Sequence, residues 1–115
     1  MEPLILVGIG GAIGSVLRYR LSRLPDFQGL PLGTLIVNAT GSFVLALLAF
    51  APVTGDLYNL LCVGLLGGYT TFSAFGFETF RLIENGDYFS ALANVILNVG
   101  FSLIGIYAGW KLYNP

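Results

Sequence analysis

Apolar residues occur in four long stretches along the chain, and charged residues and prolines separate these stretches. The second stretch lies between Pro31 and Pro52, the third covers residues 57–77, and the fourth covers about residues 88–110. Each has the length of a helix that crosses the hydrocarbon core of a membrane, which takes about 20 residues. The connections between the stretches are short, so we expect neighbouring helices to be antiparallel.

The first stretch, residues 4–17, is short for a membrane crossing and is followed by Arg18, Arg20 and Arg23. Long arginine side chains can lie along an apolar surface while their charged ends stay in water. We therefore expect the first helix to continue to about Leu24. The whole pattern predicts an all-α membrane protein, in which four transmembrane helices form a single domain over residues 1–115.

The composition agrees with a protein surface that faces lipid. Of the 115 residues, 56% are hydrophobic and 10% are charged, and the mean hydropathy is +0.83. A water-soluble domain normally carries about 25% charged residues. The same composition would also suit a subunit that is buried within a larger complex, so composition alone leaves that alternative open.

The charged and reactive residues argue against several classes of function. The net charge is −1 and there are five basic residues, which do not provide the clustered basic face that a nucleic-acid partner requires. There is no histidine, and the single cysteine, Cys62, lies in an apolar run. The chain therefore offers no metal-ligand cluster and no pair of nucleophile and base. We expect that the protein is not an enzyme.

The positive charges give only a weak preference for one orientation in the membrane. Arg18, Arg20, Arg23 and Arg81 lie on one side and Lys111 on the other, which favours the first and third loops in the cytoplasm. If Arg18 and Arg81 belong to helix ends for functional reasons, two positive charges remain against one. We therefore expect insertion in both orientations.

Small residues recur at a spacing of four on two of the predicted helices. Gly10 and Gly14 lie on the first helix, and Gly64 and Gly68 lie on the third. In lipid, helices associate through close backbone approach, which this spacing permits. The glycines therefore predict tight packing between helices.

Polar side chains form two stripes inside apolar helices. Burying such groups costs free energy unless they are hydrogen-bonded. Neutral donors and acceptors, with no acid or base in mid-span, suit either an ion path or hydrogen bonds between helices, and the spacing leaves both open. The stripes consist, at four-residue spacing, of Thr34, Asn38 and Ser42 on the second helix and of Asn94, Asn98 and Ser102 on the fourth.

The centre of the third helix contains poor helix-forming residues. Gly67 and Gly68 are followed by Thr70 and Thr71, and both glycine and β-branched residues have low helix propensity. We expect an unwound segment here, which is tolerated at membrane depth only where protein or a polar cavity satisfies the backbone. Its freed carbonyls would offer a cation site. A mild kink, with the hydroxyls bonded to the backbone, is the alternative.

Two phenylalanines follow the expected break. Phe72 and Phe75 are three residues apart and so share one face of a helix. A phenyl ring has a negative face and a positive edge, so ring edges along a narrow path could support a small anion without a fixed charge. Packing in the core or against lipid is the alternative for both.

Three motifs, in order along the chain, resemble those of the CrcB/Fluc family of fluoride channels. The residues GGAIGSVLRY at 10–19 are similar to the family's GGxxGxxxRY pattern. The residues GTLIVNATGSF at 33–43 are similar to GTLxVNxxGSF, and GGYTTFSAF at 67–75 is similar to GGxTTFSTF, departing only at Ala74. The resemblance covers nearly the whole chain.

This resemblance implies an antiparallel, dual-topology homodimer in a prokaryotic cell membrane. The dimer would have two fluoride pores and one structural, non-transported sodium ion (Na+), held by backbone carbonyls of Gly67 and Thr70 from both subunits. The third helix would be broken near its centre. Passive conduction would let cytoplasmic fluoride leave down its electrochemical gradient and so protect the cell against fluoride toxicity.

The resemblance also implies roles for individual side chains. Asn38 would be a donor in the pore, Phe72 and Phe75 would supply the ring edges, and Arg18 would lie near an aqueous vestibule. Family members often place an aromatic residue and a serine where this chain has the asparagines of its fourth helix. The other candidates for polar pore lining are Thr71, Ser73, Glu78, Thr79 and Asn98.

Two other classes of function remain as alternatives. A small multidrug-type, proton-coupled cation exporter also has four spans, but it needs an ionisable carboxylate within the first helix. Residues 4–17 contain no acid, and Glu78 could serve only if it lies deep in the membrane. A non-conducting assembly subunit would use the two polar stripes only for contacts between helices.

Overall fold

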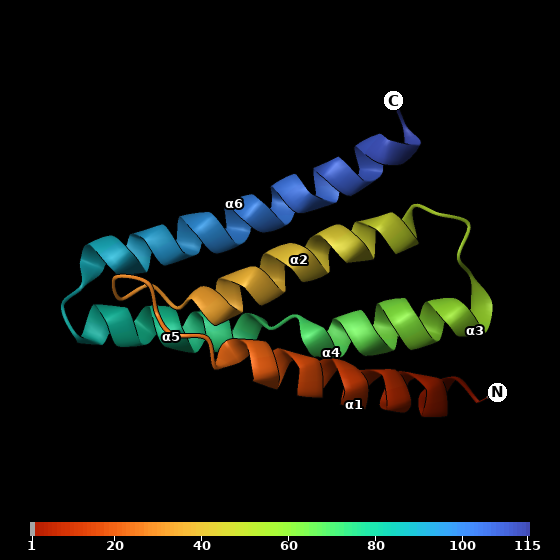
Figure 1. Cartoon of the computed structure of the whole chain (residues 1–115), viewed down its shortest axis with the longest axis horizontal. Helices are drawn as coiled ribbons and strands as arrows, with labels where there is room; N and C mark the ends of the chain where they lie inside the picture. The colour runs from red at the N-terminus through yellow and green to blue at the C-terminus, as the bar shows by residue number, and fades with distance from the viewer. Residues whose placement is uncertain (1) are drawn as a thin grey trace.

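The computed structural model describes residues 2–115, and every regular element within them is helical (Figure 1). Four segments of this part of the chain are long and apolar enough to cross a membrane, as the sequence predicts. The third crossing is divided into four elements. The elements are α1 (Pro3–Ser22), α2 (Leu32–Ala49), α3 (Gly55–Tyr58), η1 (Asn59–Leu66), α4 (Gly67–Tyr69), α5 (Phe72–Glu84) and α6 (Tyr88–Tyr113).

The ends of the helices differ from the expected bounds by a few residues. The first helix ends at Ser22, close to the expected Leu24. The third crossing, expected to end near residue 77, continues to Glu84. Charged residues do not end it: Arg81 and Glu84, both exposed, lie within α5 and form an ion pair with 3.5 Å between Nε and Oε1. The last crossing likewise continues to Tyr113.

Tight turns connect the crossings. Between α1 and α2, the backbones of Phe27 and Leu30 exchange two hydrogen bonds of 2.9 Å, and Gly29 provides the positive φ of 86° that this turn needs. Before α6, the Asp87 carboxylate accepts a hydrogen bond from the Ser90 amide at 3.2 Å and so caps the helix. Between the crossings, α2 packs against α6 and α1 packs against η1.

The contact between α1 and η1 is a close approach of two backbones. A Cβ atom at Gly10 would collide with the carbonyl oxygen of Leu60, and one at Gly14 would collide with that of Leu65. The tight packing expected from the glycine spacing is confirmed. The partner of α1 here is a π-helix, eight residues long, in which the backbone bonds join residues five apart. The pattern of residues does not predict this wider turn.

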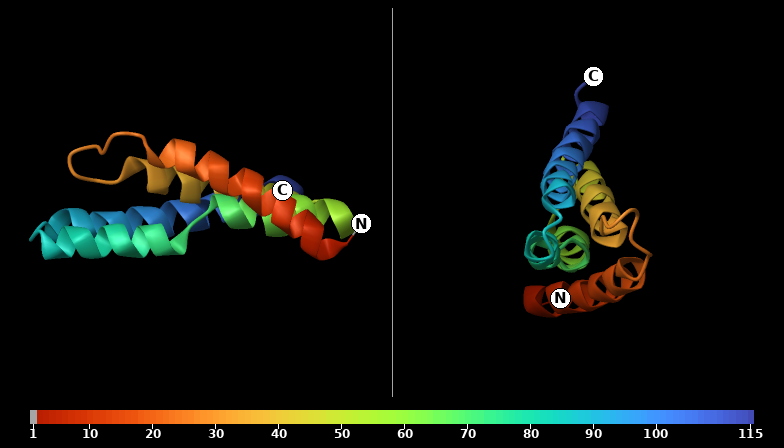
Figure 2. Two further views of the ribbon diagram at one scale, coloured as in Figure 1. Left: turned by 90° about the horizontal axis from the view of Figure 1, so that it is seen from below. Right: turned by 90° about the vertical axis from the view of Figure 1, so that its left-hand side faces the viewer.

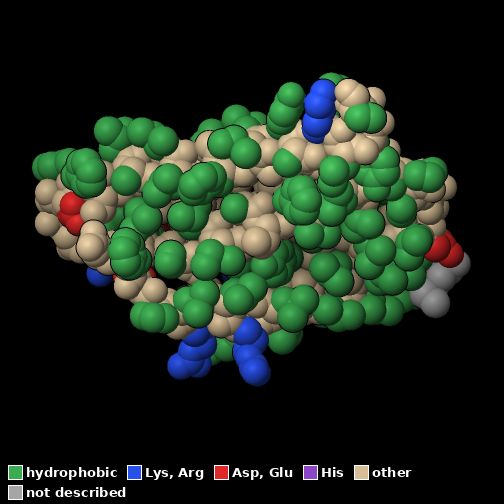
Figure 3. All heavy atoms as spheres, turned by 45° about the horizontal axis from the view of Figure 1, so that its top comes forward, with side chains coloured by type: hydrophobic (Ala, Val, Ile, Leu, Met, Phe, Trp, Pro, Cys, Tyr) green, Lys and Arg blue, Asp and Glu red, His purple; other side chains and the backbone are tan. Residues whose placement is uncertain are grey.

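The four crossings form a thin slab rather than a closed bundle. Its extents are 48 × 35 × 18 Å, and Figure 2 shows the crossings fanned out when the slab is viewed from its end. The interior is correspondingly small: among residues 2–115, the largest fully buried side chains are those of Val37 and Asn94. Hydrophobic side chains cover much of the face in Figure 3, and charged side chains lie toward its edges. This surface suits lipid or another membrane protein.

Candidate functional site

The third crossing is broken at Thr70 and Thr71, between α4 and α5. Both residues have extended backbones, with φ and ψ of −80° and 155° at Thr70 and of −148° and 121° at Thr71. The gap between the two helices is visible in Figures 1 and 2. The expected unwound segment is confirmed, and a mild kink does not describe it. The Thr71 hydroxyl caps α5 by accepting from the Ala74 amide at 3.2 Å.

The side chain of Asn38 satisfies the backbone exposed by the break. Its Oδ1 accepts a hydrogen bond from the Thr71 amide at 2.8 Å, and its Nδ2 donates to the Thr71 carbonyl at 3.0 Å. The carboxamide thus pairs with both the N–H and the C=O of one residue, Thr71, as a neighbouring β-strand would. Because unpaired backbone groups are costly at membrane depth, Asn38 on α2 is part of what keeps the third crossing open here.

Asn38 also begins a chain of hydrogen bonds through the polar stripe of α6. Its Nδ2 donates to Asn98 Oδ1 at 3.0 Å, and Asn98 Nδ2 donates to Asn94 Oδ1 at 3.1 Å and to the Asn94 carbonyl at 3.0 Å. Asn94 Nδ2 then donates to Thr79 Oγ1 at 2.9 Å, and Thr79 donates to the Phe75 carbonyl at 2.8 Å. The two stripes meet through these bonds between helices. Both N–H groups of Asn38 are thereby engaged within the chain.

An open groove of about 270 Å³ lies beside the break. It gathers Asn38, Thr71, Phe72, Phe75 and Asn98, which the sequence analysis singles out as pore residues. Ser73 is not part of its lining, although its hydroxyl lies 3.3 Å from that of Thr71. The remaining residues of the lining are Ser42, Thr70, Val99 and Ser102.

The two serines of the groove belong to the polar stripes, one turn beyond Asn38 and Asn98. The sequence analysis included Ser42 and Ser102 in the stripes but did not select them as pore residues. The signal for them was present, because their spacing of four places them on the same helix faces as the asparagines. They add hydroxyl groups to a lining that contains no acidic or basic side chain.

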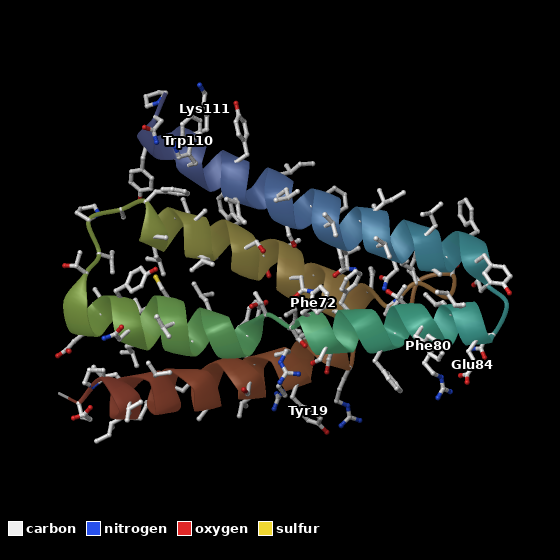
Figure 4. The ribbon with its side chains drawn as sticks, turned by 180° about the vertical axis from the view of Figure 1, so that it is seen from behind. Tyr19, Phe72, Phe80, Glu84, Trp110 and Lys111 are labelled. Carbon is white, nitrogen blue, oxygen red and sulfur yellow. The ribbon has the colours of Figure 1, made fainter. Side chains whose placement is uncertain are left out.

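The two phenyl rings are in contact but differ in their surroundings. The centroids of Phe72 and Phe75 are 5.6 Å apart, and their planes meet at 68°, an edge-to-face arrangement. Phe75 is buried, with 9% of its surface exposed, whereas Phe72 is 82% exposed. Figure 4 shows Phe72 where α5 begins, beside the break. The expectation that the two rings share a face is confirmed.

The carbonyls before the break have different partners. Arg18 Nε donates to the Gly68 carbonyl at 3.2 Å, so the arginine of α1 reaches the helix break from the opposite side to Asn38. The amide four residues after Gly67 is that of Thr71, which bonds to Asn38 instead of continuing the helix. No hydrogen bond to the Thr70 carbonyl occurs among residues 2–115. The backbone carbonyls of Gly67 and Thr70 therefore have acceptor capacity to offer a hard cation.

A second cavity, of about 410 Å³, lies nearer one end of the slab. Glu78 borders it together with Asp26, Arg81 and Asp87. The Glu78 carboxylate also accepts a hydrogen bond from the Thr34 hydroxyl at 2.5 Å, which links α5 to the start of the polar stripe on α2. Its neighbour Thr79 instead bonds to Asn94, so these adjacent polar residues point to different partners.

The family sequence model described as "CrcB-like protein, Camphor Resistance (CrcB)" matches residues 5–110. The chain belongs to the CrcB family. The glycines of α1 that contact η1, the bonds between Asn38 and Thr71, and the helix break all lie within the matched region. Since the four crossings are apolar and of spanning length, this CrcB protein is a multi-pass membrane protein.

Curated CrcB relatives are similar over almost their whole length. "Fluoride-specific ion channel FluC 3" of Methanosarcina acetivorans is 48% identical over 102 residues, which cover 88% of this chain and 92% of the relative. "Fluoride-specific ion channel FluC 2" of Haloarcula marismortui is 48% identical over 112 residues, covering 97% and 94%. "Fluoride-specific ion channel FluC" of Rhizobium meliloti is 43% identical over 123 residues, covering 97% and 96%.

Proposed function

We propose that this CrcB chain is a subunit of a fluoride channel that lets cytoplasmic fluoride leave down its electrochemical gradient. The observation that carries the proposal is the groove beside the helix break, together with relatives of nearly equal length that are named fluoride-specific ion channels. Hydrofluoric acid is weak, so it crosses membranes as HF and ionises in a near-neutral cytoplasm. A passive anion path would relieve this trapping without an energy source, and no enzymatic step is needed.

The chemistry of the groove suits a small anion in transit. Its hydroxyl groups can donate to an anion, and the edge of an aromatic ring is electropositive. The carboxamides of Asn38 and Asn98 could donate only by giving up a bond within the chain. A fixed positive charge would hold the anion too tightly, and conduction requires binding weak enough to release the ion. A lining of neutral donors and phenyl edges meets both requirements. Thr71, Phe72 and Phe75 contribute from the third crossing, and Asn38 and Asn98 from its neighbours.

Polar side chains outside the groove would provide the approach to it. Glu78 and Thr79 lie further along α5, and Ser73 lies beside Thr71 at the break. Arg18 is half-buried and bonds to the Gly68 carbonyl, so its positive charge would attract anions to an aqueous vestibule near the break. The larger cavity at Glu78 is the natural candidate for a second water-filled entrance.

We further propose that two chains associate as an antiparallel homodimer. The groove is open at the surface of the chain, and hydroxyl groups such as those of Ser42 and Ser102 would be costly to leave unpaired in lipid. In the single chain, a slab 18 Å thick, the groove stays open. A second copy would cover the groove, and the weak charge bias of the loops allows the two copies to insert in opposite orientations.

A sodium ion would fit the backbone at the break. Sodium is a hard cation that prefers oxygen ligands, and the Gly67 and Thr70 carbonyls supply two such ligands from each chain. Their duplication in a dimer would give a set of four. When bound, the ion would neutralise the carbonyl dipoles of the two breaks and hold the subunits together. Depleting sodium is then expected to weaken the dimer, which size-exclusion chromatography with and without sodium would measure.

Fluoride efflux from liposomes that contain the purified protein tests the function. We expect rapid release of fluoride, and retention of chloride, once valinomycin allows potassium to follow. Retention of both anions would contradict the proposal. The competing cation exporter lacks support in α1, which carries no acid between Pro3 and Ser22, and uptake of a cationic dye driven by a proton gradient would be its distinguishing result.

A further inference from the structure

Asn94 carries a polar, buried side chain although it does not line the groove. None of its surface is exposed, it is not part of the groove lining, and it lies where α6 packs against α5. Burying a carboxamide costs free energy unless all its groups are hydrogen-bonded. An apolar residue would fill the same position at no such cost. The polar bonds of Asn94 therefore call for a functional explanation.

The bonds at the two ends of the amide chain fix the orientation of every amide within it. The Asn94 carbonyl can only accept, so Asn98 must turn its Nδ2 toward Asn94 and its Oδ1 toward Asn38. At the other end the Thr71 amide can only donate, so Asn38 must turn its Oδ1 toward Thr71. Its Nδ2 is then left for Asn98. The oxygen and nitrogen atoms of both groove asparagines are thus assigned without ambiguity.

Asn94 completes this assignment at the buried end. Its Oδ1 takes the second N–H of Asn98 at 3.1 Å, and its own Nδ2 is held by Thr79 at 2.9 Å. The Thr79 hydroxyl donates to the Phe75 carbonyl, so its oxygen is the acceptor for Asn94. The chain therefore begins on α5 behind Phe75 and returns to the break at Thr71.

We propose that Asn94 is a positioning residue of the ion path, which acts through Asn98 and Asn38. By occupying the second N–H of Asn98, it keeps that group from turning into the groove, where it would retain a passing anion. With both N–H groups of Asn98 held on Asn94, one by its side chain and one by its backbone carbonyl, the Asn98 oxygen faces Asn38, which stays bonded to the backbone N–H and C=O of Thr71. This inference rests on the proposed conduction of fluoride, and it assigns the control of the groove amides to a residue outside the groove.

A double-mutant comparison in liposomes tests whether Asn94 acts through Asn98. Asn94→Leu keeps the approximate volume and removes both side-chain bonds, and we expect fluoride efflux to fall about tenfold, the effect of one hydrogen bond in the wall. In Asn98→Leu alone, fluoride efflux is expected to fall further. The double variant should be no slower than Asn98→Leu. Two losses that multiply would show independent roles and overturn the inference.

The matched control is Ser90→Ala, one turn away on α6. Ser90 is also buried and polar, but its side chain takes no part in the amide chain, so efflux should stay within about twofold of the unaltered protein. An equal loss in Ser90→Ala would mean that α6 packing, not Asn94, is responsible. If Asn94→Leu does not assemble, Asn94→Ala replaces it with the same expectation.

Exchange of the side-chain amide protons, followed by nuclear magnetic resonance in detergent micelles, gives a readout independent of flux. In Asn94→Leu we expect the side-chain amides of Asn98 and of Asn38 to exchange faster with solvent, and in Ser90→Ala neither should change. An unchanged Asn38 would overturn the inference. Unaltered protein that conducts no fluoride would overturn the proposed function and the role of Asn94 with it, whereas normal flux through both the unaltered protein and Asn94→Leu would overturn the role of Asn94 alone.

Discussion

The contact between α1 and η1 and the contact among α2, α5 and α6 hold helices together in different ways. In the first, glycines allow two backbones to touch, and shape decides the fit. In the second, side-chain amides and hydroxyls join the helices across the helix break. Lipid tails are as apolar as leucine, so hydrophobicity alone would favour neither contact. The comparison shows that this fold separates a region specified by packing from a region specified by hydrogen bonds, and the groove lies in the latter.

The largest effect is expected from a charge in the hydrogen-bonded region. Asn38→Asp keeps the shape but loses both donors, so an ionised carboxylate would face the Thr71 carbonyl and Asn98 Oδ1. A negative charge in the path of an anion repels it, and an added barrier of about 4 kcal/mol would slow fluoride efflux roughly a thousandfold. We expect the α1–η1 contact to be retained and the protein to elute as a dimer in size-exclusion chromatography. Normal efflux would limit Asn38 to helix packing.

A smaller effect is expected from removing an aromatic ring from the groove. Phe72→Ile and Phe75→Ile keep a large apolar side chain and lose the electropositive ring edge. If the edges contact the ion, a loss of about 2.7 kcal/mol would slow efflux about a hundredfold, while similar-volume packing changes usually cost under about 1.5 kcal/mol. Phe43→Ile and Phe101→Ile, outside the groove lining, are the controls. Equal, mild losses in all four variants would assign the rings to packing.

The packed region should respond in stability rather than in conduction chemistry. In Gly14→Ala the added Cβ would collide with the Leu65 carbonyl oxygen and lie 2.9 Å from the Tyr69 amide nitrogen. Overpacking of this kind costs about 2 kcal/mol, and a lower thermal unfolding midpoint in detergent would measure it. Gly8→Ala is the matched control on the same helix, because its Cβ would meet nothing within 4 Å. Equal midpoints for the two variants would contradict the role given to the α1–η1 contact.

The smallest effect is expected where the hydrogen-bonded region meets water. Thr34→Val removes the donor to the Glu78 carboxylate and keeps the side-chain shape. Because Glu78 also borders the larger cavity, water can replace the lost bond, and we expect a cost of about 1 kcal/mol, or roughly fivefold in efflux. Thr34→Ser retains the hydroxyl and should conduct nearly as well as the unaltered chain. A collapse in Thr34→Val would mean that water does not reach this carboxylate.

The broad features of the fold could be predicted from sequence because they depend on local patterns. The lengths of the apolar stretches gave the crossings, and the Gly67–Gly68 and Thr70–Thr71 pairs indicated the break through their poor helix propensity. The glycine spacing, which is also a local pattern, indicated close packing. By contrast, the expected end of the third crossing near residue 77 was wrong, because α5 continues past charged residues to Glu84, and the π-helix has no signature in composition.

The hydrogen-bond partners in the site could not be predicted in the same way. Spacing placed Asn38 and Asn98 on polar faces, but a face does not say which residue lies opposite it. The register between helices decides that Asn38 meets the Thr71 peptide and that Asn94 meets Thr79. For this reason the sequence left both an ion path and helix contacts open for the stripes. The structure shows the hydrogen bonds between the stripes, and the fluoride efflux measurement tests conduction.

The π-helix of η1 has a consequence for how the length of this chain can vary in evolution. A π-turn holds one residue more than the α-turn it replaces, because each backbone bond reaches five residues back instead of four. Removing one residue from Asn59–Leu66 could therefore convert a π-turn to an α-turn while the flanking segments keep the faces they present. We expect this part of the third crossing to accept a one-residue deletion that the α-helical crossings α2 and α6 would not.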